Sequence, residues 1–419
     1  MSRCLNTKNM AITTNNLLEL ANRYGCPIWI YDSKIISERI QQLRLFDVIR
    51  FAQKSCSNIH ILRLMLTAGI KVDAVSLGEI ERAIIAGYQP RSDNDDIIFT
   101  ADLINEDIIN RVKQLHIPVN AGSVDMLQQL GNNSPGHRVW LRVNPGFGHG
   151  HSNKTNTGGE NSKHGIWYTD LPCALSLINK YELQLVGMHM HIGSGVNYRH
   201  LQLVCDAMVN QVINFNQDIT AISAGGGLSI PYYPDEKPID TNQYYNLWNS
   251  ARQQIAAHLK HAVKLEIEPG RFLVAESGLL LSQVRSIKQM GNRNFILVDA
   301  GFNDLMRPVM YGSYHQISVL PGDGRYINES DLTESVIAGP LCESGDVFTQ
   351  QEDGKILTRP LPLLKVGDYL VFHDTGAYGA SMSSNYNSRP LLPEVLFENG
   401  VARQIRRRQT IYDLIALEL

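Results

Sequence analysis

The sequence has no excess of charge of either sign and no long apolar run. Its 38 lysines and arginines nearly balance 41 aspartates and glutamates, for a net charge of -3. Because polyanion binding needs a basic surface, we expect no nucleic-acid partner. No apolar run approaches the roughly 18 residues of a membrane-spanning helix, and the N-terminal MSRCLNTKNMAITTNN lacks the apolar core of a signal peptide. We therefore predict a cytoplasmic protein without membrane contact.

Cysteine patterns typical of metal sites or disulfides are also missing. Six cysteines are scattered over 419 residues without a CxxC pair, which favours free thiols and predicts no structural zinc site. The remaining composition is that of an ordinary globular protein, 43% hydrophobic and 19% charged. Because the chain is too long for one compact core, two domains are expected.

Strand-like and helix-like segments alternate eight times in the first two thirds of the chain. The eight β-rich runs are VIRFAQ, VDAVS, DIIFT, IPVNAG, RVWLRVN, LQLVGMHMHIG, ITAISAGGG and VKLEIEPG. Between them lie segments with helical spacing of apolar residues, such as IHILRLMLTAG and GEIERAIIAGY, each with a glycine suited to a helix C-terminus. This alternation predicts an α/β protein with a closed (β/α)8 TIM barrel over residues 31–277.

A different pattern follows residue 277. The runs LLLSQVRSI, NFILVDAG, SVIAGPL, DYLVFHDTG and EVLFENG are separated by glycine or charged turns, which is typical of antiparallel strands. We predict a mostly antiparallel β-barrel or sandwich domain over residues 278–419, joined by residues 1–30, where GCPIWIYD is a further strand-like run.

Polar side chains and glycines occupy the C-terminal ends of the eight apolar runs. They are Lys54, Asp73 with Ser76, Thr100, Asn120, Arg142, His191, the glycines 225–227 and Glu268. Barrels of this class carry their chemistry at that face. A lone lysine at a strand end is often a snorkelling surface residue, but the other polar ends favour a functional amine at Lys54.

Three motifs at these ends indicate ligand binding, and each has a plainer alternative. SAGGGLS offers backbone amides to a phosphate or forms a tight turn. HMHIGSG places His189 and His191 two residues apart, so that they are core residues or a metal pair. Alternatively, the His191 imidazole stacks on a flat ligand and Ser194 contacts a phosphate. EIEPGR carries a carboxylate, Glu268, which alternatively forms a structural ion pair.

Together, an amine, a carboxylate, an imidazole and a phosphate cradle are the groups that pyridoxal 5'-phosphate needs. Lys54 supplies the amine of a Schiff base, and Glu268 keeps the pyridine nitrogen protonated, which makes the ring an electron sink. We therefore predict this cofactor and a reaction at the Cα of an amino acid.

Seven motifs carry a resemblance to a known family. They are FAQKSCSN, VDAVSLGEIERA, HMHIGSG, SAGGGLS, EPGRFLV, GPLCESGDVF and DTGAYGASMSSNYNSRP. With them the chain closely resembles the diaminopimelate decarboxylases, fold-type III enzymes with an alanine racemase-like barrel, over nearly its whole length. The resemblance implies decarboxylation of meso-2,6-diaminopimelate to L-lysine and carbon dioxide, the last step of lysine biosynthesis, by a homodimer with shared active sites.

The resemblance also implies roles for individual residues. At the cofactor it places Lys54, Asp73, His191, Ser194, Gly225, Gly226, Gly227, Glu268, Gly270, Arg271 and Tyr378. At the distal end of the substrate it places Arg271, Arg307, Tyr311, Glu343 and Tyr378. Cys342 is the implied proton donor, contributed with Glu343 by the neighbouring subunit. Without the resemblance, the plainer interpretations are favoured, in which Cys342 is an inert buried thiol, Arg307 a surface cation and Tyr378 a core aromatic.

Other interpretations stay open at this point. An ornithine or lysine decarboxylase has no use for an arginine that binds a distal carboxylate, a cofactor-free regulator has no use for Lys54 and Cys342, and a racemase is poorly served by Glu268. The polar stretch GHGHSNKTNTGGENSKHG predicts a long mobile loop that covers the barrel mouth as a lid. Its His149, His151 and His164 alternatively suggest a metal site.

Overall fold

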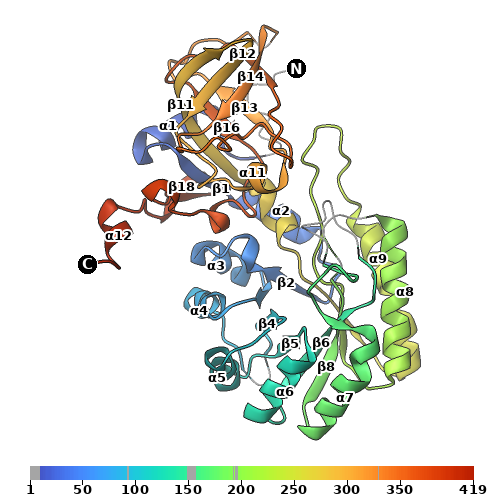
Figure 1. Ribbon diagram of the computed structural model, residues 1–419. Helices are drawn as coiled ribbons and strands as arrows, with labels where there is room; N and C mark the ends of the chain where they lie inside the picture. Colours follow the sequence, from blue (N-terminus) through green and yellow to red (C-terminus); the bar gives the residue numbers. More distant parts are fainter. Residues whose placement is uncertain (1–9, 92–93, 149–156, 192, 194–196, 329) are drawn as a thin grey trace. The chain divides into compact units, whose positions relative to one another are not determined.

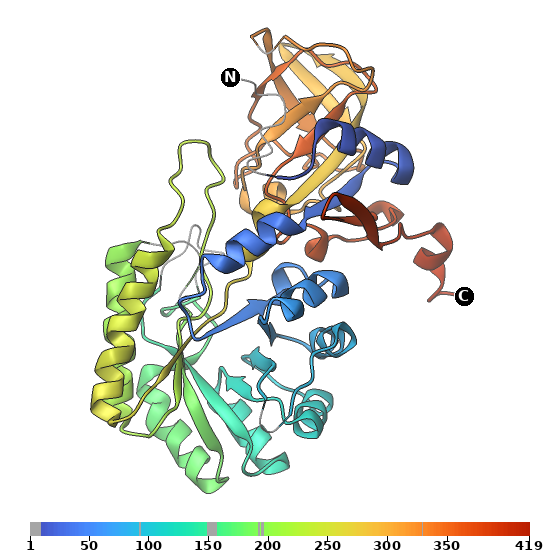
Figure 2. The same ribbon diagram turned by 180° about the vertical axis from the view of Figure 1, so that it is seen from behind.

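The computed structural model describes residues 10–91, 94–148, 157–191, 193, 197–328 and 330–419. Contacts divide the chain into two compact units, shown from opposite sides in Figures 1 and 2. The barrel unit comprises Ile40–Ser229 and Pro238–Leu273, and the β unit comprises Met1–Arg39, Ile230–Lys237 and Val274–Leu419. The domain borders expected from the sequence stay a prediction.

Within the described residues, eight parallel strands of the barrel unit close into a barrel. Their order is β2-β3-β4-β5-β6-β8-β9-β10, with β10 paired to β2. The strands are β2 (Val48–Ala52), β3 (Lys71–Ala74), β4 (Ile97–Ala101), β5 (Val119–Ala121), β6 (Arg138–Asn144), β8 (Gln184–His189), β9 (Ala221–Ser223) and β10 (Lys264–Ile267). Each overlaps one of the eight runs identified in the sequence, so the predicted (β/α)8 class is confirmed.

Helices follow the strands and surround them (Figure 1). They are α3 (Ile59–Thr67), α4 (Leu77–Ala86), α5 (Glu106–Leu115), α6 (Val124–Asn133), α7 (Leu171–Lys180), α8 (Tyr198–Phe215), α9 (Thr241–Leu259) and α10 (Arg271–Val274), with the short elements η1 (Gln53–Ser55), β7 (Ile166–Trp167) and η3 (Tyr168–Asp170). Asn58, Ser76, Asn105 and Ser123 cap helix N-termini with their side chains. Gly87, at φ 115°, ends α4 as the sequence predicts. No helix in the described part of the chain is long and apolar enough to cross a membrane.

The barrel is filled by apolar side chains and, at another level, by an ion pair. Ile98, Trp140 and Ala221 pack together as one buried cluster. Arg50 Nε lies 2.6 Å from Glu266 Oε2, and both residues are buried. Because Glu266 is level with Val48 at the start of β2, this pair lies toward the N-terminal ends of the strands, away from the polar C-terminal ends.

The β unit is built around a mostly antiparallel sheet. Its strands are β1 (Ile28–Asp32), β11 (Gly278–Met290), β12 (Arg293–Val298), β13 (Ile317–Leu320), β14 (Leu332–Ala338), β15 (Arg359–Pro362), β16 (Tyr369–Phe372), β17 (Glu394–Glu398) and β18 (Val401–Arg406). The main order is β15-β14-β12-β11-β1-β17-β18, with β16 paired to β11 and β13. The pairs β12–β14 and β1–β17 are parallel. The antiparallel prediction is confirmed, and GCPIWIYD supplies β1 as expected.

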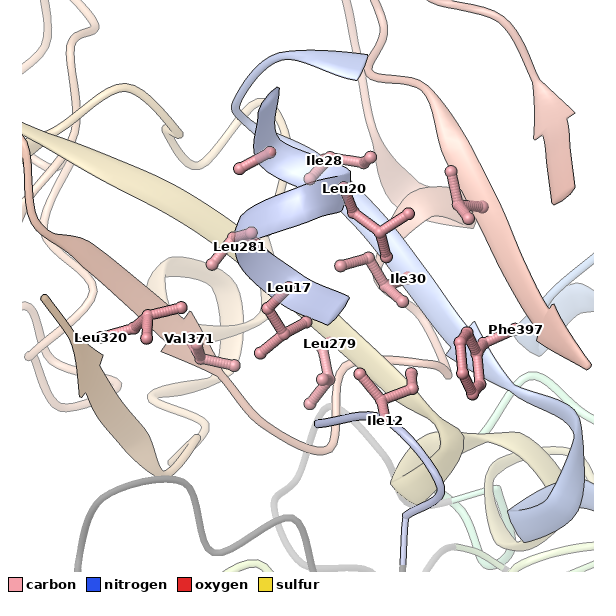
Figure 3. Close-up of a cluster of buried hydrophobic side chains, with 12 residues drawn as sticks. Ile12, Leu17, Leu20, Ile28, Ile30, Leu279, Leu281, Leu320, Val371 and Phe397 are labelled. Carbon is pink, nitrogen blue, oxygen red and sulfur yellow. The ribbon is translucent and has the colours of Figure 1, made fainter. Parts of the chain in front are cut away.

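The remaining elements of this part of the chain are short helices. They are α1 (Thr14–Tyr24), α2 (Ser33–Gln41), η4 (Ala275–Ser277), α11 (Arg307–Tyr311), η5 (Ala380–Met382), η6 (Tyr386–Ser388) and α12 (Ile411–Ile415). Figure 3 shows α1 packed on the sheet, where Leu17 and Leu20 meet Ile30 of β1 and Leu279 and Leu281 of β11. This apolar core fixes β1 in the middle of the sheet.

Candidate active site

Lys54 lies in a tight turn immediately after β2. The strand ends at Ala52, and η1 carries the lysine with its side chain exposed, between two buried neighbours. The turn is held by Gln53 Nε2, which donates to the Glu79 carbonyl at 3.1 Å, and by Ser55 Oγ, which donates to the Ala52 carbonyl at 2.9 Å. These bonds place an accessible amine on a fixed support at the C-terminal end of β2.

Gly270 brings the end of β10 against the same turn. A Cβ added at Gly270 would lie 3.1 Å from both the Ala52 carbonyl oxygen and Ser55 Oγ, which is tighter than an ordinary contact. Arg271 follows as the first residue of α10 and is half-buried. The EPGR motif therefore packs directly on the turn that carries Lys54.

Glu268 is a buried, oriented carboxylate just beyond β10. Its Oε2 accepts a hydrogen bond from His189 Nε2 at 2.7 Å, and its Oε1 accepts one from Ser223 Oγ at 3.0 Å. Burial acts to raise the pKa of Glu268, but the charge of His189, these two hydrogen bonds and the Arg50 charge outweigh it, so the pKa lies below its ordinary value. Glu268 is therefore ionised at neutral pH.

His191 is a neutral imidazole held by the glycine triplet after β9. The Gly226 backbone N–H donates to His191 Nδ1 at 3.1 Å, so the ring hydrogen of a neutral imidazole is on Nε2. Burial and the charges of Arg142 and Lys54 hold the pKa of His191 well below its usual value. An uncharged ring suits the stacking interpretation of His191, which stays a prediction.

The glycine triplet after β9 has no room for side chains. A Cβ added at Gly225 would lie 2.6 Å from the Met190 carbonyl oxygen, and one added at Gly226 would lie 2.7 Å from the Glu268 carbonyl oxygen. A Cβ added at Gly227 would lie 2.4 Å from the Gly193 carbonyl oxygen. The strand ends therefore meet backbone to backbone. Ser194, the other phosphate contact expected from the sequence, lies outside the described residues, so the phosphate cradle stays a prediction.

Acceptor atoms without partners lie among the other strand ends. Asp73 Oδ1 and Asn120 Oδ1 are buried and have no hydrogen-bond partner among the described residues, although Asn120 Nδ2 donates to Thr100 Oγ1 at 3.4 Å. Burial, and then the nearby Glu268, raise the pKa of Asp73 to about 6, against the opposing effect of Lys54. Buried unpaired acceptors are rare in folded proteins and indicate a place where a polar ligand or water binds.

The described ends of the loop 146–165 are anchored to the barrel unit. Asn144 Oδ1 accepts backbone N–H groups from the loop at 2.9 and 3.1 Å. The Asp102 carboxylate forms a hydrogen bond with Nδ1 of the His164 ring. Whether the loop acts as a lid stays a prediction, because its centre, with His149 and His151, lies outside the described residues.

Four of the predicted substrate residues, Arg307, Tyr311, Glu343 and Tyr378, lie in the β unit. Arg307, the first residue of α11, is buried, and its Nη1 donates to His315 Nε2 at 2.8 Å. The Arg307 guanidinium also lies over the Tyr232 ring, at 4.6 Å from its centre. Tyr311 ends α11 and is half-buried. Tyr378, also half-buried, adopts a φ of 56°, which is uncommon outside glycine.

Cys342 and Glu343 lie exposed on a turn of the β unit that Asp346 holds in place. Asp346 accepts the Phe302 N–H at 2.7 Å and the N–H of the residue before Cys342 at 2.8 Å. The Cys342 N–H donates to Asn387 Oδ1 at 2.8 Å. The CESGD turn is thus tied to the segment after β12 and to the NYNS segment, so that motifs far apart in the sequence meet here.

Several supporting residues escaped the sequence analysis. Ser223, Asp346 and Asn387 stand inside the motifs quoted for the resemblance, and His315 ends the stretch LMRPVMYGSYH, but their partners could not be read from the sequence. Tyr232 gave no signal, because the chain around it separates two barrel strands yet belongs to the β unit.

The fold and the site define a class of enzyme, the pyridoxal-dependent decarboxylases. The model of the family described as pyridoxal-dependent decarboxylase, pyridoxal binding domain, matches residues 33–275, which span the barrel. Pyridoxal phosphate is the cofactor of this class, and the residues present fit it: an accessible amine at Lys54, an ionised carboxylate at Glu268, a neutral ring at His191 and unpaired buried acceptors beside them.

Curated and solved relatives give the particular family. The chain is similar to a diaminopimelate decarboxylase of Escherichia coli K12, with 70% identity over 100% of both chains. A crystal structure of a diaminopimelate decarboxylase matches with a TM-score of 0.97, 70% identity and 99% of each chain covered. The Helicobacter pylori diaminopimelate decarboxylase complexed with L-lysine matches with a TM-score of 0.82 and 31% identity, over 96% of this chain and 99% of that one. The chain belongs to the diaminopimelate decarboxylase family, so the family and activity predicted from the sequence are confirmed.

Proposed function

We propose that the chain decarboxylates meso-2,6-diaminopimelate to L-lysine through the residues at the C-terminal ends of the barrel strands. The observation that carries this assignment is the joint placement of Lys54 and Glu268. Parallel strands in a closed barrel end at one face, and β2 and β10, which precede these two residues, are hydrogen-bonded neighbours. An amine and an ionised carboxylate that follow directly after two adjacent strands match the two ends of a pyridoxal ring.

In this proposal each barrel residue has one task. Pyridoxal phosphate, when bound, supplies the electron sink for the electron pair that carbon dioxide leaves behind. Lys54 holds the cofactor covalently before substrate arrives. Glu268 keeps a proton on the pyridine nitrogen, and its low pKa suits that task because it remains charged. His191 offers a flat, uncharged ring for stacking, and Asp73 and Gly225–Gly227 complete the cradle with Ser194.

The β unit supplies the substrate contacts in this proposal. Arg307 and Tyr311, with Arg271, bind the carboxylate at the distal L-centre, and Glu343 binds the distal amine. A distal centre with both charges needs a cation and an anion, and a guanidinium fork matches a carboxylate in two hydrogen bonds. Tyr378 contacts both cofactor and substrate. A decarboxylase for simple diamine precursors would need only the anion.

We further propose a cytoplasmic homodimer in which Cys342 and Glu343 enter the active site of the neighbouring subunit. Cys342 would deliver the proton to Cα after carbon dioxide leaves. Support comes from the CESGD turn, which is firmly held by Asp346 while both Cys342 and Glu343 are exposed. A rigid turn that presents a thiol and a carboxylate outward suits a contribution to a partner's site.

The assignment is tested by carbon dioxide release from meso-diaminopimelate, ornithine, L-lysine and arginine. We expect release from diaminopimelate only, with a loss of roughly 1000-fold or more in Lys54→Ala. Borohydride reduction should attach a pyridoxyl group to the Lys54 peptide of the wild-type protein. Release from ornithine or L-lysine would overturn the roles of Arg307 and Glu343, and labelling of another lysine would overturn that of Lys54.

A further inference from the structure

The Arg307 side chain is enclosed by two neighbours within the β unit. Its Nη1 donates to His315 Nε2 at 2.8 Å, and its guanidinium lies 4.6 Å from the centre of the Tyr232 ring. The Tyr232 and His315 rings meet edge to face at 5.7 Å. Arg307 and His315 are only 5% and 4% exposed. We call these three residues, Arg307, His315 and Tyr232, the arginine clamp.

The contact with Arg307 fixes the protonation of His315. A guanidinium has donors and no acceptor, so His315 Nε2 must accept the hydrogen bond. The ring hydrogen is therefore on Nδ1, which donates to the His373 carbonyl oxygen at 2.8 Å. A ring flip would lose both hydrogen bonds at once. His315 is consequently a neutral acceptor that holds the guanidinium in one rotational position.

The strand pair β13–β16 supports His315 from behind. The residue that receives its hydrogen bond, His373, follows β16, and the His373 N–H donates to the Gln316 carbonyl at 2.9 Å. The His373 ring also shares a hydrogen bond with Ser318 Oγ of β13 at 2.8 Å. The acceptor that faces Arg307 therefore rests on regular sheet structure.

A capped turn supports Tyr232. The Glu236 carboxylate accepts the backbone N–H of Tyr232 at 2.7 Å and that of Tyr233 at 3.1 Å. Tyr233 stacks on Tyr314 at 4.4 Å between ring centroids. A cation over an aromatic face is attracted by the ring quadrupole, so this turn adds a second fixed contact to the guanidinium.

We propose that His315 and Tyr232 are positioning residues that set the selectivity for a ligand with a distal carboxylate. They hold the Arg307 guanidinium in the orientation in which its fork meets that carboxylate. This inference rests on the proposed function of Arg307. Preorganisation improves affinity because the side chain loses less freedom on binding, and here the benefit goes only to ligands that carry the carboxylate.

Two ligands separate this role from a general structural one. L-lysine retains the distal carboxylate, and cadaverine is the same diamine without it. Binding of both to the holoenzyme is measured by calorimetry. We expect His315→Leu to weaken L-lysine roughly 10-fold, as for a lost hydrogen bond to a charged group, with cadaverine unchanged. His315→Gln, which retains an acceptor oxygen, should restore part of the loss, and Tyr232→Leu should show a smaller one.

Control variants separate the positioning role of His315 and Tyr232 from a general effect on the structure. Tyr326→Leu, at an exposed tyrosine of the β unit, should leave the ratio of the two affinities unchanged. Arg307→Gln should abolish the preference for L-lysine; if it does not, the proposed function of Arg307 fails. If Arg307→Gln abolishes the preference while His315→Leu and Tyr232→Leu retain it, the positioning role is overturned. Equal weakening of both ligands in the His315 variants would likewise overturn it.

Discussion

Asp304 shows how the burial of one residue creates a pH dependence. It is 1% exposed, and its carboxylate accepts the Gly301 N–H at 3.1 Å and Asn303 Nδ2 at 3.2 Å. Burial raises the pKa of Asp304 to about 7, against the hydrogen bond from Gly301 and the charge of Arg389. Two hydrogen bonds from neutral donors stabilise the charged carboxylate less than the hydration that an exposed aspartate has.

The sign of the resulting effect on stability follows from linkage. The folded-state pKa of Asp304, about 7, lies above the unfolded value, about 3.9, so the folded state binds the proton more tightly. The stabilisation is complete below the unfolded pKa and is lost as pH rises through the folded one. Between pH 6 and 8 the free energy of unfolding should fall by about 1.4 kcal/mol more in the wild type than in Asp304→Asn.

Urea unfolding at pH 6 and pH 8 measures this difference. Asp235→Asn, at an exposed aspartate, is the matched control and should show the wild-type fall. An Asp304→Asn protein whose stability falls as steeply as that of the wild type would show that another group causes the pH dependence.

At the scale of elements, the loop after β9 depends on backbone contact with its neighbours. A Cβ at Gly226 would lie 2.7 Å from the Glu268 carbonyl oxygen, and the Glu268 N–H already donates to the Gly225 carbonyl at 2.8 Å. The glycine loop and the residue proposed to hold the pyridine nitrogen are thus one backbone unit. A side chain in the loop would displace both.

Gly226→Ala should therefore lose stability and cofactor together. Overpacking of this kind costs about 1–3 kcal/mol, and a shift of Glu268 should weaken pyridoxal phosphate binding as well. Gly78→Ala, where a Cβ would meet nothing closer than 3.9 Å on helix α4, is the control and should stabilise by about 0.5–1 kcal/mol. Thermal melting and cofactor titration of both variants test this, and a Gly226→Ala protein that melts and binds like the wild type would contradict it.

The same elements show what the sequence can and cannot predict. Strands such as β2 and β10 were predictable because each is a short apolar run with a polar end, and parallel closure then brings Lys54 and Glu268 to one face. The hydrogen bond from His189 to Glu268 was not predictable, because the two residues are 79 positions apart and come into contact only when the barrel closes. β13 and β15 were missed because the first is a short run that alternates weakly and the second contains prolines.

The sequence also did not predict contacts between a segment of one unit and residues that lie far from it along the chain. The residues around Tyr232 lie between two barrel strands in sequence, but they pack in the β unit. The periodicity of apolar residues indicates the local secondary structure of a segment, but it does not indicate which unit the segment packs in. The cation–π contact with Arg307 therefore had to come from the structure.

At the scale of the whole molecule, the residues assigned to one reaction are divided between the two units. Lys54 and Glu268 belong to the barrel unit, and Arg307, Cys342 and Glu343 belong to the β unit. The homodimer proposed above adds a second division, because the thiol and the carboxylate of the CESGD turn would serve the partner. Such a site should show complementation between inactive subunits.

Mixed dimers of Lys54→Ala and Cys342→Ala test this division. If the thiol comes from the partner, each mixed dimer has one intact site, and random exchange should restore about 25% of wild-type activity, since half the dimers are mixed and half their sites intact. Lys54→Ala mixed with Glu268→Gln should restore none, because both residues come from one subunit. Recovery in the second mixture, or none in the first, would contradict the shared site.

The central position of β1 has a consequence for how the protein is made. Trp29 of β1 pairs with Glu394 of β17, so a strand from the beginning of the chain waits for one near its end. At ribosomal speeds of about 5–20 residues per second, that wait lasts roughly 20 to 70 seconds. The intervening barrel emerges meanwhile and can fold on the nascent chain, whereas β1 stays without its partner strands until β11 and β17 are synthesised.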